Sequence, residues 1–333
     1  MKKIGILTYW GVPNYGAWTQ AYALNNIVKE LSGNDSEVVH LNYLSKIHWN
    51  SYYENDIQLC NAFTYSWEEI EHSNIMTENE LEEKKYDILI TGSDSIWEFS
   101  HSQMGNDIHL IGNKLNAEKI ISYAASFGET NREDLEKWVA DGLRNYSLIT
   151  VRDYHSKKIV KELLGNVKCE IVLDPSLLYD FVNDSKVKEP VYKKYIVVYG
   201  VVFDDEFVSD TIKLAHDNGL ELISVGYINK WCDRSIKMLE LRTFEWLGFF
   251  KNAEYVVTSM FHGLMVGLSF HKQVKFNQVQ YVKNRSQTLL ELLNIEDEVS
   301  DFNSVINYDD VNILLTEMRN KSYDILRKEL RND

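Results

Sequence analysis

The feature that most constrains this chain is a repeated alternation between short β-branched runs and longer segments with helical periodicity. Runs such as Leu148–Val151 and Tyr255–Thr258 are short and apolar, and a helix-like segment follows each of them. Such alternation predicts parallel sheets with helices on both faces. The predicted strands span residues 3–9, 38–43, 86–91, 119–123, 148–151, 195–202, 221–225, 255–258 and 273–276. The predicted helices span residues 17–31, 67–85, 133–144, 154–164, 204–217, 243–252, 261–270 and 309–330, and residues 44–66 are predicted to be a long loop with some helix.

A single break in the alternation indicates a linker. The segment Asp174–Val191 contains two of the three prolines, Pro175 and Pro190, and a polar run between them. The 333 residues are enough for about two domains. We expect an N-terminal α/β domain at residues 1–183, a C-terminal α/β domain at 190–308, and a helix at 309–333 that could pack back on the first domain. Pockets commonly lie between domains, so an interdomain cleft is the expected place for a site.

Composition and charge exclude several classes of protein. The chain is 44% hydrophobic and 26% charged, which is ordinary for a globular protein, and no run approaches the roughly 20 apolar residues of a membrane span. A formal charge of −15 argues against non-specific binding to nucleic acid, which depends on cationic side chains. The three cysteines are widely spaced and include no Cys-x-x-Cys pair, so neither a disulfide framework nor a zinc site is expected.

The first ten residues predict a strand rather than a signal peptide. Two lysines precede a short apolar stretch, but Thr8, Tyr9 and Gly11 interrupt it and no small-residue cleavage site follows. The protein is therefore expected to be cytoplasmic.

Loops that follow predicted strands carry small and polar residues, and such loops bind ligands in open α/β sheets. The loop that contains Asn14 and Gly16 is explained equally well as a plain turn or as a binding loop. Asp94 could cap a following helix, or it could hold a sugar hydroxyl beside Trp97 as an apolar platform.

Two arginines are candidate anion ligands. Arg152 directly follows a predicted strand, and Arg285 lies near the start of a predicted helix. Each is either a surface charge, with Asp153 or a helical neighbour as the partner of Arg152, or an anion clamp. The second interpretation rests on the guanidinium group, which binds carboxylates and phosphates through two hydrogen bonds.

The segment Thr258–Gly263 places a histidine in the first turn of a predicted buried helix. With Ser259 as the N-cap, His262 occupies the third helical position, beside N–H groups that attract anions. The helix dipole keeps the ring neutral in an empty site, whereas a bound phosphate favours the protonated ring. A structural role is the commoner explanation of such a histidine, and acid–base catalysis is the alternative.

Taken together, these motifs resemble the polysaccharide pyruvyl transferase family. They occur in the family's order along most of the chain, and the ordered set is more specific than any single motif. The motifs are Asn14-Tyr15-Gly16-Ala17 with Gln20, Gly92-Ser93-Asp94 with Trp97, Tyr123-Ala124-Ala125-Ser126-Phe127-Gly128, Val151-Arg152-Asp153, Asp174-Pro175, Thr258-Ser259 with Phe261-His262-Gly263, and Asn284-Arg285.

The resemblance implies an α/β fold of two Rossmann-like domains, similar to B-type glycosyltransferases. It implies an enzyme that moves the pyruvyl unit of phosphoenolpyruvate onto two sugar hydroxyls as a ketal. This chemistry requires neither a cofactor nor a metal. The expected acceptor is a sugar in a polysaccharide or in a lipid-linked precursor, which would imply peripheral association with the inner face of a membrane.

The resemblance also assigns roles to individual residues. His262 and Arg152 are the expected catalytic residues, with His262 as acid and base. Donor binding is expected at Arg152, Ser259, Phe261, Gly263 and Arg285. Acceptor binding is expected at Asn14, Tyr15, Gly16, Ser93, Asp94 and Trp97.

Met260 departs from the family's pattern, which often has an arginine two residues before the histidine. Either another cation takes its place or the donor differs; the candidate cations are Arg152, Arg285, Lys275 and Arg234. A nucleotide-sugar-dependent glycosyltransferase and a non-catalytic glycan-binding homologue are therefore the alternative functions.

Overall fold

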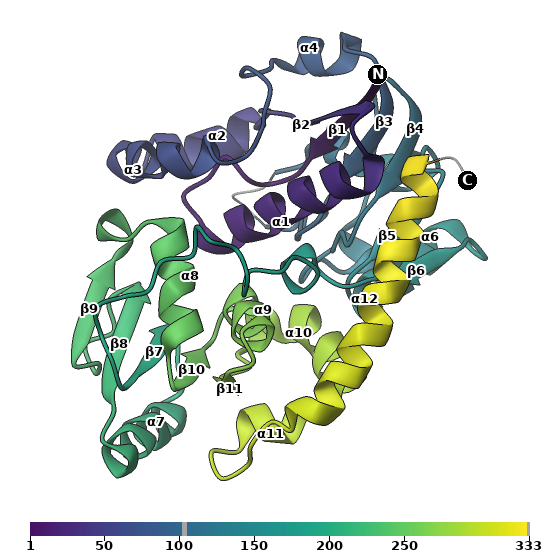
Figure 1. The fold of residues 1–333 in the computed structure, drawn as a ribbon. Coiled ribbons are helices and arrows are strands. Elements are labelled where there is room, and N and C mark those ends of the chain that lie inside the picture. The colour runs from purple at the N-terminus through teal and green to yellow at the C-terminus, as the bar shows by residue number, and fades with distance from the viewer. Residues whose placement is uncertain (102–104, 332–333) are drawn as a thin grey trace. The chain divides into compact units, whose positions relative to one another are not determined.

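The computed structural model describes residues 1–101 and 105–331, and it divides into two compact units. Unit 1 comprises Met1–Tyr179 and Glu317–Asp333, and unit 2 comprises Asp180–Thr316. The change of unit falls inside the segment expected to be the linker. The C-terminal helix α12 (Tyr308–Arg331) begins in unit 2 and ends in unit 1 (Figure 1). The expected C-terminal segment also includes residues 332 and 333, which lie outside the described residues.

Unit 1 is built on parallel strands. Its main sheet has the order β2-β1-β3-β4, formed by β1 (Lys2–Leu7), β2 (Ser36–His40), β3 (Tyr86–Thr91) and β4 (Ala117–Ser122). A second parallel pair consists of β5 (Ile149–Val151) and β6 (Cys169–Ile171). Isolated bridges between Ile121 and Leu148 and between Ala125 and Val151 connect this pair to the β4 side of the sheet.

Helices connect the strands of unit 1. α1 (Tyr15–Ser32) begins where the Asn14 side chain accepts hydrogen bonds from Gly16 N and Ala17 N, and α6 (Tyr154–Leu164) begins where the Asp153 side chain accepts one from Ser156 N. The other helices are α2 (Lys46–Tyr53), α3 (Ile57–Trp67), α4 (Glu78–Glu83) and α5 (Lys137–Leu143). Short 3-10 turns lie at Ile108–Ile111, Arg132–Asp134 and Pro175–Leu177.

The predictions for residues 44–85 need correction. The predicted loop at 44–66 is mostly helical, because side-chain oxygens of Ser45 and Asp56 cap the first turns of α2 and α3. The predicted helix at 67–85 shrinks to α4, which starts only at a capping box formed by Thr77 and Glu80. Capping residues therefore decide where these helices begin.

Unit 2 contains a five-stranded parallel sheet with the order β11-β10-β7-β8-β9. Its strands are β7 (Tyr195–Tyr199), β8 (Glu221–Gly226), β9 (Arg234–Lys237), β10 (Tyr255–Thr258) and β11 (Gln273–Phe276). All residues of the central strand β7 are buried, as expected for a strand covered on both faces. Its helices are α7 (Asp205–Asn218), α8 (Thr243–Asn252), α9 (Phe261–Ser269), α10 (Gln280–Leu293) and α11 (Glu296–Ser300), with a 3-10 turn at Met238–Glu240.

The C-terminal part of α12 packs on unit 1. Ser322 Oγ accepts a hydrogen bond from Leu173 N (3.1 Å), and Leu326 and Leu330 are buried. Lys2 Nζ donates to Leu330 O (2.7 Å), so the last turns of the helix also contact the start of β1. No helix within residues 1–101 and 105–331 is long and apolar enough to cross a membrane.

Candidate functional site

Each unit has a place where the strand order reverses, and ligands of open α/β sheets bind at such places, outside the carboxyl ends of the strands. In unit 1 the reversal lies between β1 and β3, and the loops at residues 8–14 and 92–97 follow these strands. In unit 2 it lies between β7 and β10, and the loops at residues 200–204 and 259–260 follow them. The predicted site residues of each unit therefore gather mostly near its own switch point.

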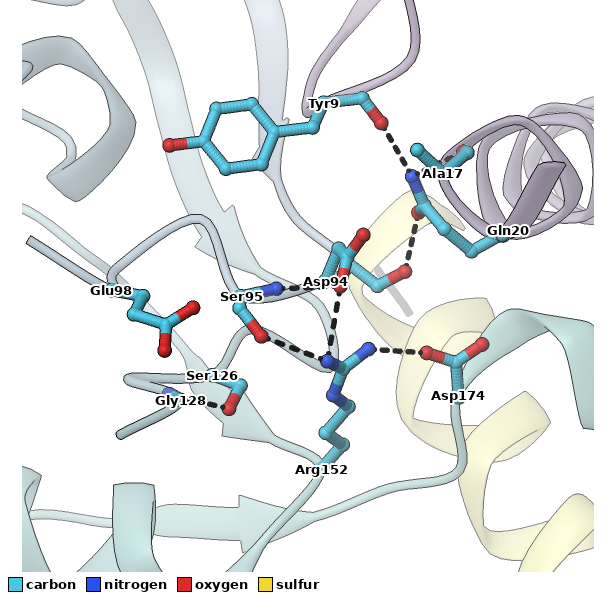
Figure 2. A network of polar contacts seen from close by, with 12 residues as sticks. Tyr9, Ala17, Gln20, Asp94, Ser95, Glu98, Ser126, Gly128, Arg152 and Asp174 are labelled. Atoms are coloured by element: carbon cyan, nitrogen blue, oxygen red, sulfur yellow. Dashed lines mark hydrogen bonds and ion pairs between the residues drawn. The ribbon is translucent and has the colours of Figure 1, made fainter. Parts of the chain in front are cut away.

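Three charged residues at the carboxyl ends of strands in unit 1 form a continuous network (Figure 2). Arg152, which follows β5, donates from Nη2 to Asp94 Oδ1 (3.0 Å) and from Nη1 to Asp174 Oδ2 (2.8 Å). Nη2 also lies 3.0 Å from Ser95 Oγ. Burial alone would lower the pKa of Arg152, but the carboxylates of Asp94, Asp174 and Asp153 outweigh it and raise that pKa. The guanidinium group therefore stays charged inside the unit.

The position of Arg152 excludes its interpretation as a surface charge, because its side chain is only 2% exposed. Its guanidinium group donates to Asp94 and Asp174, and the charge of Asp153 also acts on it. This geometry allows Arg152 to position Asp94. Its predicted roles in anion binding and catalysis stay predictions.

Asp94 is the part of this network that reaches the surface of the unit. Its side chain is 17% exposed, and its backbone lies in the left-handed region with φ of +79°. Such a conformation is uncommon for aspartate and is typical of functional sites. Gly92 is required beside it, since a Cβ there would lie 2.3 Å from Tyr123 O. No helix starts at Asp94, so the predicted N-cap role is wrong.

The remaining residues expected to bind the acceptor lie inside unit 1. The Ser93 hydroxyl is buried and donates to Gln20 Oε1 (2.5 Å). The Gln20 side-chain Nε2 in turn donates to Tyr9 O (2.8 Å; Figure 2). Trp97 is fully buried, and its Nε1 donates to Leu110 O (2.8 Å), so it cannot serve as the expected platform for a sugar. Tyr15 and Gly16 are likewise buried, and the Asn14 side chain caps α1.

The sequence did not single out several polar residues near this switch point. Glu98 is buried, and its Oε1 accepts a hydrogen bond from Glu129 N (3.0 Å). The negative charges of Asp107, Asp94 and Glu98 all act on the buried Tyr9 hydroxyl; together with burial, which is the larger cause, they raise the pKa of Tyr9. The available sequence signals were the position of Tyr9 at the end of the first predicted strand and that of Glu98 beside Trp97.

In unit 2, α9 begins at Phe261, as the predicted range 261–270 has it, but its N-cap is not the predicted Ser259. Met260 rather than Ser259 is the N-cap, and its N–H donates to Thr258 Oγ1 (3.1 Å). His262 therefore occupies the second helical position and is partly exposed, with its ring edge-on to Phe261 at 5.2 Å between centroids. The first N–H groups of a helix have no partner within the helix, so His262 lies beside an anion-attracting helix start.

Close packing fixes this turn on the end of the sheet. Thr258 Oγ1 donates to Tyr199 O (2.6 Å), and Ser259 is fully buried. A Cβ on Gly263 would lie 2.1 Å from Thr258 Oγ1, so only glycine allows α9 to approach β10 this closely. Phe261 is also buried. The geometry thus gives Ser259, Phe261 and Gly263 a structural role. Their predicted contact with a donor stays a prediction.

The four candidate replacements for a cation at Met260 have different surroundings. Tyr281 of α10 lies with its hydroxyl 3.0 Å from Met260 Sδ and 3.1 Å from Ser259 O, and Arg285 follows one turn later on the same helix. Lys275 is buried, and its Nζ donates to three main-chain carbonyls, those of Glu298, Asp301 and Ser304 (2.7 Å each).

Arg234 is at the other end of the sheet. It is the first residue of the edge strand β9, and its Nε donates to Glu221 Oε1 (3.0 Å). Of the four cations, Arg285 is thus the one on the helix that contacts Met260. Within the described ranges, no group of three or more histidine, cysteine or acidic side chains is arranged to hold a metal ion.

Comparisons with known proteins agree with the family resemblance of the sequence and with its α/β fold. A family model described as polysaccharide pyruvyl transferase matches residues 14–274. No curated protein matches the sequence. A putative UDP-N-acetylglucosamine 2-epimerase from Listeria monocytogenes has a similar structure, with a TM-score of 0.56 and 8% identity over 100% of this chain and 98% of that chain. The S. aureus MnaA–UDP co-structure has a TM-score of 0.53 and 13% identity over 98% and 91%. At these identities the likeness concerns the fold alone, and it confirms the predicted Rossmann-like α/β fold similar to B-type glycosyltransferases.

Proposed function

Because this chain belongs to the polysaccharide pyruvyl transferase family, we propose that it transfers the pyruvyl unit of phosphoenolpyruvate to two hydroxyls of one sugar. The products are a cyclic ketal and phosphate. The acceptor is a polysaccharide or its lipid-linked precursor, which would bring the protein to the cytoplasmic face of a membrane. The observation that carries the proposal is the division of charge between the switch points. In unit 2 a helix start carries His262 and is contacted by α10, the helix of Arg285, and in unit 1 the Asp94 carboxylate is partly exposed.

The donor is assigned to unit 2, whose switch point suits an anion. Phosphoenolpyruvate carries a phosphate and a carboxylate, and the first N–H groups of α9 and the guanidinium of Arg285 offer complementary charge. Ser259, Phe261 and Gly263 shape the turn that presents these N–H groups. We assign Arg152 to the acceptor side rather than to this donor site, because it lies in unit 1 and binds Asp94 and Asp174.

The acceptor is assigned to unit 1. The partly exposed carboxylate of Asp94 can accept hydrogen bonds from sugar hydroxyls. Arg152 holds that carboxylate and Asp174 holds Arg152, so both are positioning residues. Of the other expected acceptor residues, Tyr15, Gly16, Ser93 and Trp97 are buried, and Asn14, which is partly exposed, caps α1.

The reaction requires proton transfers that a histidine can perform near neutral pH. Two hydroxyl oxygens form bonds to the carbon that carries the phosphate, and the bond from this carbon to the phosphate oxygen breaks. Of the two hydroxyl protons, one reaches the terminal CH2 group, which becomes a methyl group, and the other leaves with the phosphate. We assign these transfers to His262, whose protonated form is favoured while the dianionic phosphate is bound.

The test is incubation of the protein with phosphoenolpyruvate and a panel of galactosides, mannosides and N-acetylhexosaminides, some of them lipid-linked. The expected result is a ketal mass gain together with phosphate release. His262→Ala should abolish both without unfolding the protein. His216→Ala, which changes an exposed histidine on α7, is the matched control and should retain full activity. Turnover by His262→Ala would remove the acid–base assignment.

Two other functions predict different results in the same experiments. A nucleotide-sugar-dependent glycosyltransferase would be stabilised in thermal unfolding by nucleoside diphosphates and not by phosphoenolpyruvate. A glycan-binding homologue would bind sugars without releasing phosphate from any donor. A thermal shift with phosphoenolpyruvate alone, followed by phosphate release with one sugar, excludes both.

A further inference from the structure

Three buried polar atoms without a hydrogen-bond partner come together near the switch point of unit 1. Within the described residues these atoms are Tyr9 Oη, His48 Nε2 and Asp107 Oδ2. The rings of Tyr9 and His48 meet edge-on with centroids 4.5 Å apart, and the negative charge of Asp107 acts on both residues. Unpaired buried polar groups are rare in folded proteins, and each one calls for an explanation.

The three side chains are held in place by their other atoms. Asp107 Oδ1 accepts hydrogen bonds from His109 N (3.0 Å) and from the His109 ring (2.8 Å), while Oδ2 has none. The Tyr9 carbonyl accepts a hydrogen bond from Gln20 Nε2, and the Tyr9 ring points away from Gln20 (Figure 2). Tyr9 Oη and Asp107 Oδ2 are therefore left without partners, although other atoms of the same residues are hydrogen-bonded.

The helix that carries His48, α2, buries little of its own surface. His48 is its only buried residue, and its partly exposed Tyr53 also contacts Gly11 O (3.5 Å) and the Trp67 ring. The Trp49 ring, 38% exposed, stacks on Tyr53 at 3.7 Å and adds an aromatic surface to the helix. Segments with few buried apolar contacts open at low free energy, and unpaired polar groups beneath α2 further weaken its closed position.

We propose that α2 is a lid on a sugar-binding subsite: when it lifts, the Tyr9 hydroxyl and the Asp107 carboxylate bind hydroxyls of a neutral sugar beside Asp94. The proposal rests on the acceptor side of the proposed function and adds residues to it. The negative charges of Asp107, Asp94 and Glu98 all act on the Tyr9 hydroxyl, which disfavours an anionic ligand. Sugar hydroxyls, in contrast, donate well to carboxylates. Burial lowers the pKa of His48 to about 4 and raises that of Tyr9, so both are neutral near pH 7.

A pair of matched tyrosine variants tests the subsite. Tyr86 also has a buried hydroxyl without a partner in the described ranges, but it starts β3, at the amino end of the sheet. Neither Tyr9→Phe nor Tyr86→Phe should destabilise the protein in urea, because each removes an unpaired buried hydroxyl. Tyr9→Phe alone should weaken the binding of neutral methyl glycosides roughly three- to tenfold, which corresponds to one hydrogen bond. Equal glycoside affinity in the two variants overturns the subsite, as does a loss of stability in Tyr9→Phe, which would indicate a structural hydrogen bond.

Hydrogen exchange tests the lid. Amides of residues 46–53 should exchange faster than those of α1 in the intact protein, and methyl glycosides should slow them while phosphoenolpyruvate alone should not. Unchanged exchange with every glycoside overturns the lid. These measurements need no transfer, so they separate the two proposals: glycoside binding without phosphate release removes the proposed function, whereas ketal formation with unchanged exchange removes only the lid.

Discussion

Arg152 Nη1 lies 2.8 Å from Asp174 Oδ2, and both side chains are only 2% exposed. Asp174→Asn keeps the shape and removes the charge, so Arg152 keeps Asp94 as a charged partner and loses one charge-assisted hydrogen bond. We predict that this variant lowers the free energy of unfolding by about 1.5–3 kcal/mol. Urea denaturation of the full chain measures this change.

An exposed ion pair of unit 1 is the control for that experiment. Asp141 accepts from Arg144 on the surface, where the two side chains are 49% and 57% exposed. Asp141→Asn should therefore change the free energy of unfolding by less than about 1 kcal/mol. If Asp174→Asn cost no more than this control, the network would not be what holds Asp94 in place.

The buried imidazole of His40 makes the stability of the protein depend on pH. Burial, aided by the positive charges of His72 and Lys29, lowers the pKa of His40 from 6.5 to about 3. The unfolded chain therefore takes up a proton below pH 6.5 that the folded chain does not, and stability is lost as the pH falls from 6.5 toward 3. At about pH 5 this loss amounts to about 2 kcal/mol.

The variant His40→Gln should lose less stability on acidification than the natural chain, because glutamine does not titrate. The Gln side chain can still accept the hydrogen bond from Asn25 Nδ2, which lies 3.1 Å from His40 Nδ1. Urea midpoints at neutral pH and near pH 5 give the comparison, with His216→Gln on exposed α7 as the control. Equal acid sensitivity in all three proteins would contradict the prediction.

Gly263 is predicted to tolerate no side chain. The Cβ of alanine would lie 2.1 Å from Thr258 Oγ1, which cannot move away because it also contacts Tyr199 O and Met260 N. Gly263→Ala should cost about 1–3 kcal/mol and displace the start of α9, so that phosphate release from phosphoenolpyruvate slows as well. Gly11→Ala, whose Cβ would meet only Leu44 at 3.9 Å, should be nearly neutral.

The pattern of the sequence predicted most of the sheet. The strands Tyr86–Thr91 and Tyr255–Thr258 have their predicted bounds, because β-branched runs between turns leave little choice of structure. β6 and β9 were missed, since each has at most four residues and no apolar run. α9 begins at the predicted Phe261, but its N-cap is Met260 rather than the predicted Ser259, and no side chain caps its first turn.

The site was harder to predict, because its partners are distant in sequence. Arg152 follows a strand as expected, but Asp174 and Asp94 are 22 and 58 residues away, and no local pattern shows that they meet. Trp97 shares a loop with Asp94, and only the fold reveals that one side chain points inward and the other outward. Periodicity gives the faces of helices and strands, whereas the orientation of loop side chains depends on tertiary packing.

The C-terminal helix provides the last prediction. Leu326 is buried where α12 packs on unit 1, whereas Ile313, earlier in the same helix, is 61% exposed. Leu326→Ala should lower the free energy of unfolding by about 2–5 kcal/mol, and Ile313→Ala by less than about 0.5 kcal/mol. The contact of Lys2 Nζ with Leu330 O lies one turn beyond Leu326, so Leu326→Ala should also speed amide exchange in β1. Unchanged exchange in β1 would mean that the helix end is not part of the cooperative core of unit 1.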